Sequence, residues 1–513
     1  MYLILTASKD TYITNKILNS SYRATDANVG RAGTLDLFKL YNESDLDGET
    51  NPIELSRILL KFNYDTLQDL TSTVLDITHP SFKCELKLYN VLSSHATPRN
   101  FNIATYALSQ SFDEGIGRDV GSFSDLDVSN FVTASYSGGT VYPWYVTGAN
   151  RGGELNSSDI DFITSGAVGS GLEDLGVFKY FDKGTEDLEI NVTKLVSASM
   201  VGLVPNHGFR IAYSGTEETD TKTRFVKRFG SRHAKNIFIR PQMHVSFDDT
   251  ISDHHQSFVF DVSGSLFLNN YHRSSPANIL SGTSLTPLVG ESCLQVTLKT
   301  GSFSKTVNAS MHTGSTTGEG QVGIYSATFA LPFSDQTVVD GGSTVHNFAV
   351  KSGSLTFDEF WHSNDGTVGF YTGSLTINSP QRSASSFVAR RPMIKVTNLQ
   401  SAYSSTDKVK LRVFGVDTIA QQNKPSKVPS KIKSVIYDEV YYRVVDAEAG
   451  KVVIPFAKGN NGTRVSSESE GMFFEFHMNA LYPQRVYYFE FLVVDRGTEF
   501  RLQDKTPRFK VTT

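Results

Sequence analysis

Hydrophobic and polar side chains alternate along many short segments of this chain. Two clear examples are SRILLKF at residues 56–62 and KCELKLYNV at residues 83–91. A period of two places alternate side chains on opposite faces of a strand, one toward a core and one toward water. We therefore predict that these segments are neighbouring strands of an antiparallel sandwich, each with one buried and one solvated face.

The pattern restarts twice after polar stretches, which predicts three β-sandwich domains at residues 1–250, 251–392 and 393–513. The middle range contains SFVFDVSGSLFLN, SCLQVTLKTG and GFYTGSLTINS, separated by Gly, Ser and Thr. In the last range, Leu481, Pro483 and Tyr487 resemble the fibronectin corner, in which a tyrosine hydroxyl bonds to upstream backbone. That corner directs Tyr487, Phe489 and Phe491 inward. Proline and lysine between 421 and 433 predict a long protruding loop.

Composition agrees with an all-β chain in which many short strands are joined by turns. The sequence has 513 residues, of which 40 are Gly, 22 are Tyr and 39% are apolar. This length exceeds the size of a single hydrophobic core. The net charge of -5 provides no overall field for nucleic acid or anionic membrane. Only two cysteines occur, and the N-terminus shows no basic and apolar export pattern, so we expect assembly in a reducing compartment.

The first half of the chain resembles the disaggregatase-related β-sandwich module known as DNRLRE. The resemblance rests on the order of motif residues along the chain, with Phe112 where the family usually has tryptophan. The matching positions are Asp10, Tyr12, Asn28, Gly30, Arg57, Phe62, Glu114, Gly115, Gly117, Trp144 and Gly148. The resemblance implies a jelly-roll-like first sandwich. The strand patterns of the two later ranges predict immunoglobulin- or fibronectin III-like units after it. The resemblance also implies that Arg57 is a buried or partner-contacting position.

The acidic loops have solvated turns as their simplest interpretation. Two-residue spacing of oxygen ligands suits calcium, but Thr50 stands where the EF-hand loop needs glycine. The residues at this spacing are Asp45, Asp47, Glu49, Asn51 and Glu54, and a shorter acidic loop contains Asp125 and Asp127. We therefore predict no metal site here and no cofactor elsewhere.

Histidine and cysteine offer no catalytic pattern in this sequence. His254 and His255 are adjacent, so in a strand they point to opposite faces, and a polar linker is the simpler interpretation. Cys84 continues an alternating strand and is predicted to be a small core residue. A G-x-S-x-G nucleophile elbow is absent from the sequence. We predict that the protein is not an enzyme, while a polysaccharide-degrading enzyme stays open as a third class.

A basic and aromatic stretch at residues 222–240 is the strongest local charge cluster. Beside rings such as Phe225 and Phe229 its cations could contact phosphate or nucleic acid, but a structural role within the sandwich is the simpler explanation of the stretch. We consider nucleic acid unlikely and assign the remaining role to a partner protein. The residues expected to make that contact are Arg224, Lys227, Arg228 and Arg232.

A second candidate site is the aromatic group Tyr142, Trp144 and Tyr145. Aromatic faces stack on sugar rings, so the three side chains are candidates for glycan contact. Trp144 also matches a position of the DNRLRE module, which makes packing an equal alternative. No catalytic role is assigned to these residues.

The opening segment is similar to the N-terminal sandwich of virion structural proteins of large tailed bacteriophages. The residues that carry this similarity are TASKDTYITNKI and RATDANVGRAGTLDLFKLY. The resemblance implies an oligomeric component of the neck, tail, baseplate or fibre region, assembled in the bacterial cytoplasm and held by other virion proteins, without membrane. The alternative is a glycan-binding surface or receptor-binding protein that uses the group Tyr142 to Tyr145.

Overall fold

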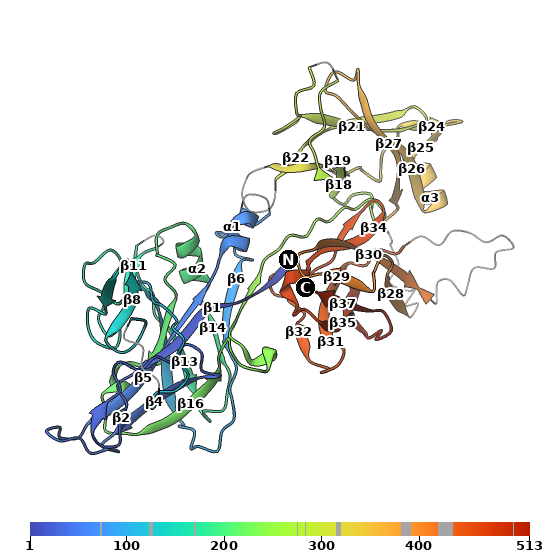
Figure 1. The fold of residues 1–513 in the computed structure, drawn as a ribbon. Coiled ribbons are helices and arrows are strands. Elements are labelled where there is room, and N and C mark those ends of the chain that lie inside the picture. The colour runs from blue at the N-terminus through green and yellow to red at the C-terminus, as the bar shows by residue number, and fades with distance from the viewer. Residues whose placement is uncertain are drawn as a thin grey trace. The chain divides into compact units, whose positions relative to one another are not determined.

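The computed structural model describes residues 1–71, 74–122, 127–168, 171–273, 275–282, 284–313, 320–380, 391–418, 434–495 and 497–513. These residues divide into two compact units. The N-terminal unit comprises Leu3–Asp69 and Phe82–Val245, and the C-terminal unit comprises Met1–Tyr2, Leu70–Ser81 and Ser246–Thr513. Figure 1 shows strands throughout both units, as the all-β prediction requires. The protein is a series of antiparallel β-sandwiches.

The N-terminal unit is built on one 13-stranded sheet. Its main path runs through β10 (Gly152–Glu154), β11 (Phe162–Ala167), β7 (Phe101–Leu108), β15 (Phe209–Tyr213), β5 (Ile53–Phe62), β1 (Tyr2–Thr14), β17 (Gln242–Ser246), β6 (Lys83–Leu88) and β14 (Leu188–Asn191). Branches are formed by β12 (Leu172–Asp174) on β11, β13 (Val177–Phe181) on β7, and β4 (Thr34–Tyr41) on β5, with β16 (Arg224–Gly230) on β4. Smaller elements are β2 (Ile17–Leu18), β3 (Tyr22–Arg23), β8 (Thr133–Ser137), β9 (Thr140–Pro143), α1 (Asp65–Thr71), α2 (Thr193–Met200), η1 (Gly215–Glu218) and η2 (Ile237–Ile239).

Two predictions about β5 and β6 are wrong. The strands are not neighbours, because β1 and β17 lie between them in the sheet. On β5 the polar side chains are buried as well as the apolar ones: Ser56 and Arg57 are as enclosed as Leu59. A central strand with layers on both faces has no solvated side, so its polar residues need internal partners. The alternation on β6 is confirmed, with Cys84 in the core.

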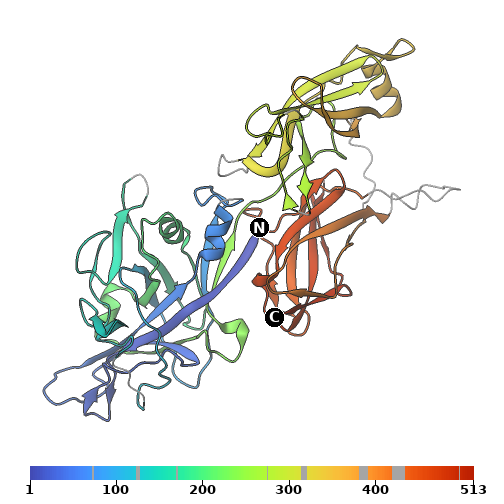
Figure 2. The ribbon, with the colours of Figure 1, turned by 45° about the horizontal axis from the view of Figure 1, so that its top comes forward.

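The middle range forms one six-stranded sheet that bends on itself. The strands lie in the order β18 (Gly264–Asn269), β23 (Gly320–Phe329), β22 (Phe303–Thr313), β21 (Leu294–Thr300), β26 (Ser354–His362) and β27 (Gly369–Asn378). The first half of β22 pairs with β21 and its end pairs with β23, so this strand joins the two halves. Phe260, Leu298 and Trp361 belong to the core that the sheet encloses, and Figure 2 shows the curled strands in yellow-green to gold.

Short elements complete the middle range. They are β19 (Tyr271–His272), β20 (Ser275–Pro276), β24 (Val338–Asp340), β25 (Ser343–Thr344) and α3 (Val345–Ser352). Thr344 caps α3 by accepting a hydrogen bond from the Asn347 amide, and Gly353 ends the helix in the left-handed region. No helix of the described residues has the length and apolar character to cross a membrane.

The last range is a β-sandwich of two sheets. One sheet has the order β28 (Pro392–Val396), β30 (Lys408–Asp417), β34 (Gly471–His477) and β33 (Ser466–Glu468). The other has the order β29 (Ala402–Ser404), β37 (Arg508–Thr512), β35 (Arg485–Asp495), β31 (Glu439–Asp446) and β32 (Val452–Ile454), and β36 (Thr498–Leu502) pairs with β35. The short helix η3 (Met478–Ala480) precedes β35 in the chain. The predicted loop at residues 421–433 lies outside the described residues.

The tyrosine corner of this last sandwich is confirmed. The Tyr487 hydroxyl donates to the Tyr482 carbonyl at 2.9 Å. Tyr487, Phe489 and Phe491 are buried, and the Phe489 ring stacks on Phe509 at a centroid distance of 5.0 Å. The middle range ends with β27 at Asn378, and the last range begins with β28 at Pro392. Both ranges nevertheless belong to the single C-terminal unit.

Candidate functional site: an exposed aromatic hairpin and buried ionisable clusters

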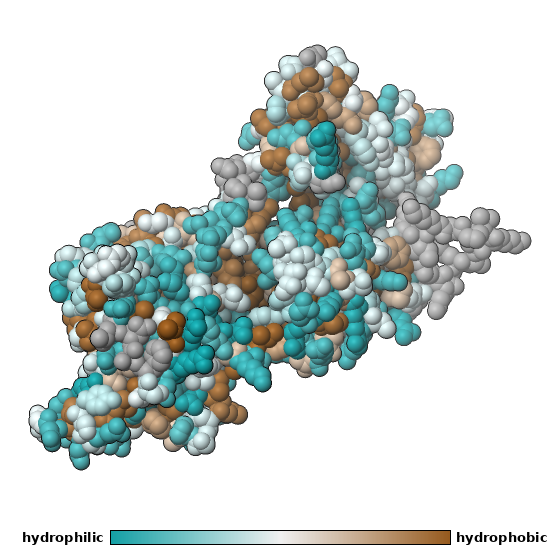
Figure 3. Space-filling view, viewed as in Figure 1, coloured by the Kyte–Doolittle hydropathy of each residue, from teal (hydrophilic) through white to brown (hydrophobic). Residues whose placement is uncertain are grey.

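The hairpin of β8 and β9 exposes large apolar side chains on both of its faces. Its turn uses Gly138 and Gly139, whose φ angles of 59° and 83° match the positive values that a tight hairpin turn requires. Tyr136 and Val141 are cross-strand partners on one face, while the ring of Tyr142 lies on the other. We call the exposed side chains of this region the hairpin patch, and its members are Tyr136, Val141, Tyr142, Tyr145 and Val146. Figure 3 shows hydrophobic residues among polar ones on the surface of the N-terminal unit.

The predicted aromatic group is divided between surface and core. Tyr142 and Tyr145 are 49% and 53% exposed, whereas Trp144 is only 3% exposed. The Trp144 indole donates to the Asn130 carbonyl at 2.9 Å and packs in a cluster that contains Phe112. Trp144 is therefore an internal anchor, and a three-ring platform that includes it is not formed. Phe112, which is 1% exposed, fills the same core.

Asp161 holds the segment after β9 in place, and sequence reasoning missed this role. Its buried carboxylate accepts hydrogen bonds from the amides of Tyr145 at 2.8 Å, Val146 at 3.1 Å and Arg151 at 2.9 Å, and from the Gln110 side chain at 2.9 Å. Three backbone donors on one carboxylate fix a loop without regular structure. The hairpin patch therefore stands on a rigid base. An isolated aspartate in a loop carries no sequence pattern that announces this role.

The basic stretch is used inside the N-terminal unit. Lys227 is fully buried, with Nζ 2.7 Å from Asn90 Oδ1 and 2.8 Å from the Gly184 carbonyl, and burial lowers its pKa to about 8. Arg224 is also buried and pairs with Asp220 at 2.7 Å. The expected partner contact is wrong for these two, because a buried cation cannot reach another molecule.

The other two cations of this stretch are partly exposed but also paired within the unit. Arg228 contacts Asp36 at 2.7 Å through Nε. Arg232 contacts Glu114 at 2.8 Å and the Ser8 carbonyl at 2.6 Å. These internal pairs favour a structural role for the basic stretch over a role as a docking surface.

Arg57 is buried, as one of its two expected roles requires. Its guanidinium makes two hydrogen bonds to Glu218, at 2.9 and 2.8 Å, and one to the Gly148 carbonyl at 2.6 Å. Burial alone would raise the pKa of Glu218, but the bonds and charge of Arg57 hold it below its usual value. Nearby, burial and the charge of Arg57 lower the pKa of Arg210 to about 9. These groups cross-link β5, β15 and η1.

Asn28 gathers motif residues that are far apart in the sequence. Its Nδ2 donates to the carbonyls of Glu114 at 2.9 Å and Ser129 at 2.8 Å, and its Oδ1 accepts from the amides of Gly30 at 3.1 Å and Gly117 at 2.9 Å. A Cβ on Gly30 would lie 1.8 Å from the Glu114 carbonyl oxygen. The approach of the two backbones therefore requires glycine there.

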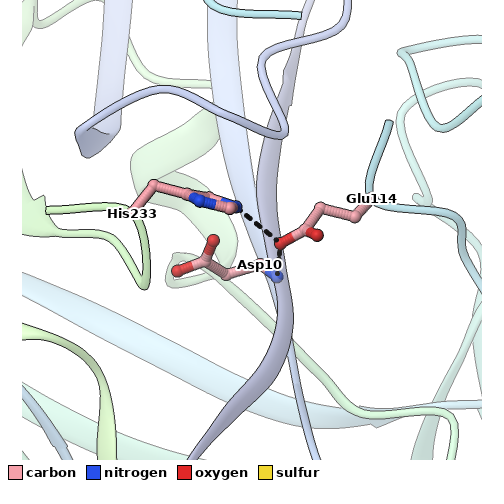
Figure 4. A group of neighbouring side chains, drawn as sticks. All are labelled: Asp10, Glu114 and His233. Carbon is pink, nitrogen blue, oxygen red and sulfur yellow. Dashed lines mark hydrogen bonds and ion pairs between the residues drawn. The ribbon is translucent and has the colours of Figure 1, made fainter. Parts of the chain in front are cut away.

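Asp10, Glu114 and His233 form a second polar cluster (Figure 4). Their ligand-type atoms all lie within 4.8 Å of one another. Glu114 Oε1 accepts from the Asp10 amide at 3.0 Å and lies 3.4 Å from His233 Nε2. Burial raises the pKa of Asp10 to about 7. Three separate segments, β1, the 111–117 turn and the loop after β16, supply these residues.

In the C-terminal unit, His255 lies between two buried carboxylates. Its Nε2 is 2.9 Å from Glu359 Oε2 and its Nδ1 is 3.9 Å from Asp253 Oδ1. Burial raises the pKa of Asp253 to about 7. The pKa of His255 is also raised, because its bond to Glu359 and the two negative charges outweigh the lowering effect of burial. The polar linker expected here is thus an organised cluster, which sequence reasoning missed because Glu359 is distant along the chain.

The acidic loop does not assemble a calcium site. Glu49 pairs with Arg23, and Glu54 is buried and accepts from the Ile17 amide at 2.7 Å. Asp45 and Asp47 are exposed to solvent. In the other acidic loop Asp127 is exposed, and Asp125 lies outside the described residues. Glu49 and Glu54 are thus used by partners within the unit, as the solvated-turn interpretation of the other residues allows.

Comparison with known proteins leaves the fold as the class that can be stated: tandem antiparallel β-sandwiches. No protein-family model matches the chain, and no curated protein matches it. Among solved structures, dimeric latent PorU from Porphyromonas gingivalis is 10% identical with a TM-score of 0.15, covering 94% of this chain and 34% of that one. A putative membrane anchored protein from Corynebacterium diphtheriae is 8% identical with a TM-score of 0.15, covering 100% and 97%. The chain thus spans about a third of the PorU chain, and at these scores neither similarity informs function.

Proposed function

We propose that the protein is a non-enzymatic structural component of a tailed-phage particle that acts through protein–protein contacts, as an oligomer among other virion proteins. The hairpin patch is the observation that carries this proposal. Tyrosine is enriched at protein interfaces, where its ring buries area and its hydroxyl finds a partner. Tyr142 and Tyr145 are exposed on a segment held by Asp161 and Trp144. Little ordering is needed before such a surface binds.

The surrounding ion pairs support the same role. Arg57 with Glu218, Arg224 with Asp220 and Arg228 with Asp36 link strands within the N-terminal unit. Charged groups paired in this way stabilise the sandwich, so the contact with other proteins is assigned to its exposed apolar side chains. The sequence similarity of the opening segment to phage virion proteins supplies the setting for that contact. Cytoplasmic assembly and a place in the neck, tail, baseplate or fibre region follow from that similarity.

The test combines particle composition with one set of variants. Mass spectrometry of purified particles is expected to detect the chain, and native mass spectrometry of the free protein is expected to detect oligomers. A Y136S/Y142S/Y145S variant is expected to fold normally but to be excluded from particles. The matched control is F178S/Y180S, which removes two other exposed rings of the same unit. Particles without the chain, or normal incorporation of the hairpin variant, would contradict the proposal.

A second candidate function is glycan contact by the same hairpin, as in a receptor-binding protein. It is favoured by the exposed rings of Tyr142 and Tyr145, which could stack on sugar faces. Binding to host envelope polysaccharide, lost in Y142A/Y145A but kept in the F178S/Y180S control, would support this role. An array of diverse glycans with no binding would exclude it.

A further inference from the structure

The cluster of Asp10, Glu114 and His233 has the ligands and the spacing of a zinc-type site. Zinc binds nitrogen and carboxylate oxygen at about 2.0–2.1 Å, which in a tetrahedron separates neighbouring ligand atoms by about 3.3–3.4 Å. His233 Nε2 and Glu114 Oε1 are 3.4 Å apart. Asp10 contributes a third atom within 4.8 Å of both. Small side-chain shifts would therefore bring all three to one ion.

An oxygen of Asp10 supplies an independent reason to expect a ligand. Asp10 is 0% exposed, and its Oδ2 accepts from the Arg232 amide at 2.5 Å. Its Oδ1 is buried without a hydrogen-bond donor among the described residues. Figure 4 shows the Asp10 carboxylate beneath the His233 imidazole, with Glu114 reaching the group from the other side. A buried carboxylate oxygen with no donor is costly, and a bound cation satisfies it.

We propose that the N-terminal unit binds one divalent transition-metal ion of the zinc class through Asp10, Glu114 and His233. Water completes the coordination, because the chain provides three ligands. A set of one imidazole and two carboxylates suits zinc and its neighbours, whereas calcium takes six to eight oxygens. Such an ion would pin β1 to the 111–117 turn and to the loop after β16. The inference is independent of the proposed phage role.

Arg232 is the group that competes with the metal. Its Nη1 lies 3.0 Å and 2.8 Å from the two Glu114 oxygens. The guanidinium and the ion therefore require the same carboxylate. The Arg232 side chain is 34% exposed and that of His233 is 30% exposed, so Arg232 can turn toward solvent and the ion has a route of entry. Removing Arg232 should consequently tighten metal binding.

The test uses the full chain, freed of metal with a chelator, and zinc or cobalt as the probe. Isothermal titration is expected to show a zinc site that is lost in H233A and D10N, by at least about 100-fold in affinity, because removing even a residue that only orients a ligand costs about 10- to 100-fold. R232M is expected to bind more tightly than the wild type. Cobalt is expected to give the visible absorption of a four-coordinate site, which H233A abolishes.

Two measurements keep the proposal falsifiable. H207A, which removes a half-buried histidine elsewhere in the N-terminal unit, is the matched control and should leave stoichiometry and spectrum unchanged. Unfolding of each variant without metal identifies loss of binding that only reflects misfolding, and H233A is expected to fold because the side chain is partly exposed. The proposal is overturned if the wild type binds no zinc, if binding survives both D10N and H233A, or if R232M weakens it.

Discussion

Asn28→Ala is expected to destabilise the N-terminal unit severely, although it removes only a short polar side chain. The amide is 0% exposed and makes four hydrogen bonds, at 2.8 to 3.1 Å, all to backbone groups. A typical internal hydrogen bond contributes about 0.5–1.5 kcal/mol net. Losing four of them should therefore lower the free energy of unfolding by about 4 kcal/mol if water does not reach the four partner groups. Two of those partners, the amides of Gly30 and Gly117, are donors in a tightly packed turn.

The assay is urea unfolding followed by Trp144 fluorescence in a W361F background. The chain has two tryptophans, and Trp144 is the one in the N-terminal unit. The free energies of unfolding of the variant and the wild type are compared, provided that the slope of this free energy against urea concentration is the same for both. Asn191→Ala is the matched control, because Asn191 is exposed and its Oδ1 accepts one bond, from the Thr193 amide at 2.9 Å. Its cost should be about 1 kcal/mol or less, which is the range of one ordinary hydrogen bond.

Asn28→Asp distinguishes the contribution of the two hydrogen bonds that Asn28 donates from that of the two that it accepts. The carboxylate keeps the two bonds to the amides but turns an oxygen toward the carbonyls of Glu114 and Ser129. It should therefore destabilise the unit at neutral pH as much as alanine does. A loss below about 1 kcal/mol for Asn28→Ala, within the range of one ordinary bond, would refute the reasoning that this residue organises the turn.

Three further predictions concern other parts of the chain. Trp144→Ala should cost about 3–5 kcal/mol by opening a core cavity, whereas Tyr145→Ser should leave urea unfolding nearly unchanged; equal losses would contradict the division into anchor and surface. Tyr487→Phe should cost about 1 kcal/mol by removing the corner bond, measured by unfolding of the C-terminal unit against Tyr488→Phe on the same strand. Asp253 keeps its proton up to about pH 7 when folded and loses it near 3.8 when unfolded, so folding takes up a proton between these values and stability falls as pH rises through them. Hydrogen exchange of β26 should show this loss at pH 8 relative to pH 5. Asp253→Asn should reduce the loss and leave the part that comes from the raised pKa of His255; protection that rises with pH would contradict the cause assigned to the shift.

Local patterns were sufficient for the strands and for the tyrosine corner. Alternation identified β6 because one of its faces is solvated, and the spacing of Leu481, Pro483 and Tyr487 located the corner because its hydrogen bond spans only five residues. The same rule failed on β5. Its polar residues Ser56 and Arg57 alternate as solvated residues would, but layers on both sides bury them.

The candidate site was predictable only in part. An aromatic group around Tyr142 is visible in the sequence, but which ring is buried depends on the packing of Trp144 against residues such as Ile13 and Leu59. The basic stretch is equally visible, and its internal use depends on partners as distant as Asp36 and Asn90. Charge in a sequence indicates a need for partners and does not say whether they lie inside or outside the fold.

The sequence by itself determined the all-β class, the alternating strands, the glycine-dependent turns and the corner, because each depends on backbone preference or on contacts between near neighbours in the chain. Only the tertiary structure decided the rest. It placed β1 and β17 between β5 and β6, buried Lys227, and brought Asp10, Glu114 and His233 to one point. These outcomes depend on long-range strand order and burial, which set the distance and the solvation of groups that no local pattern connects.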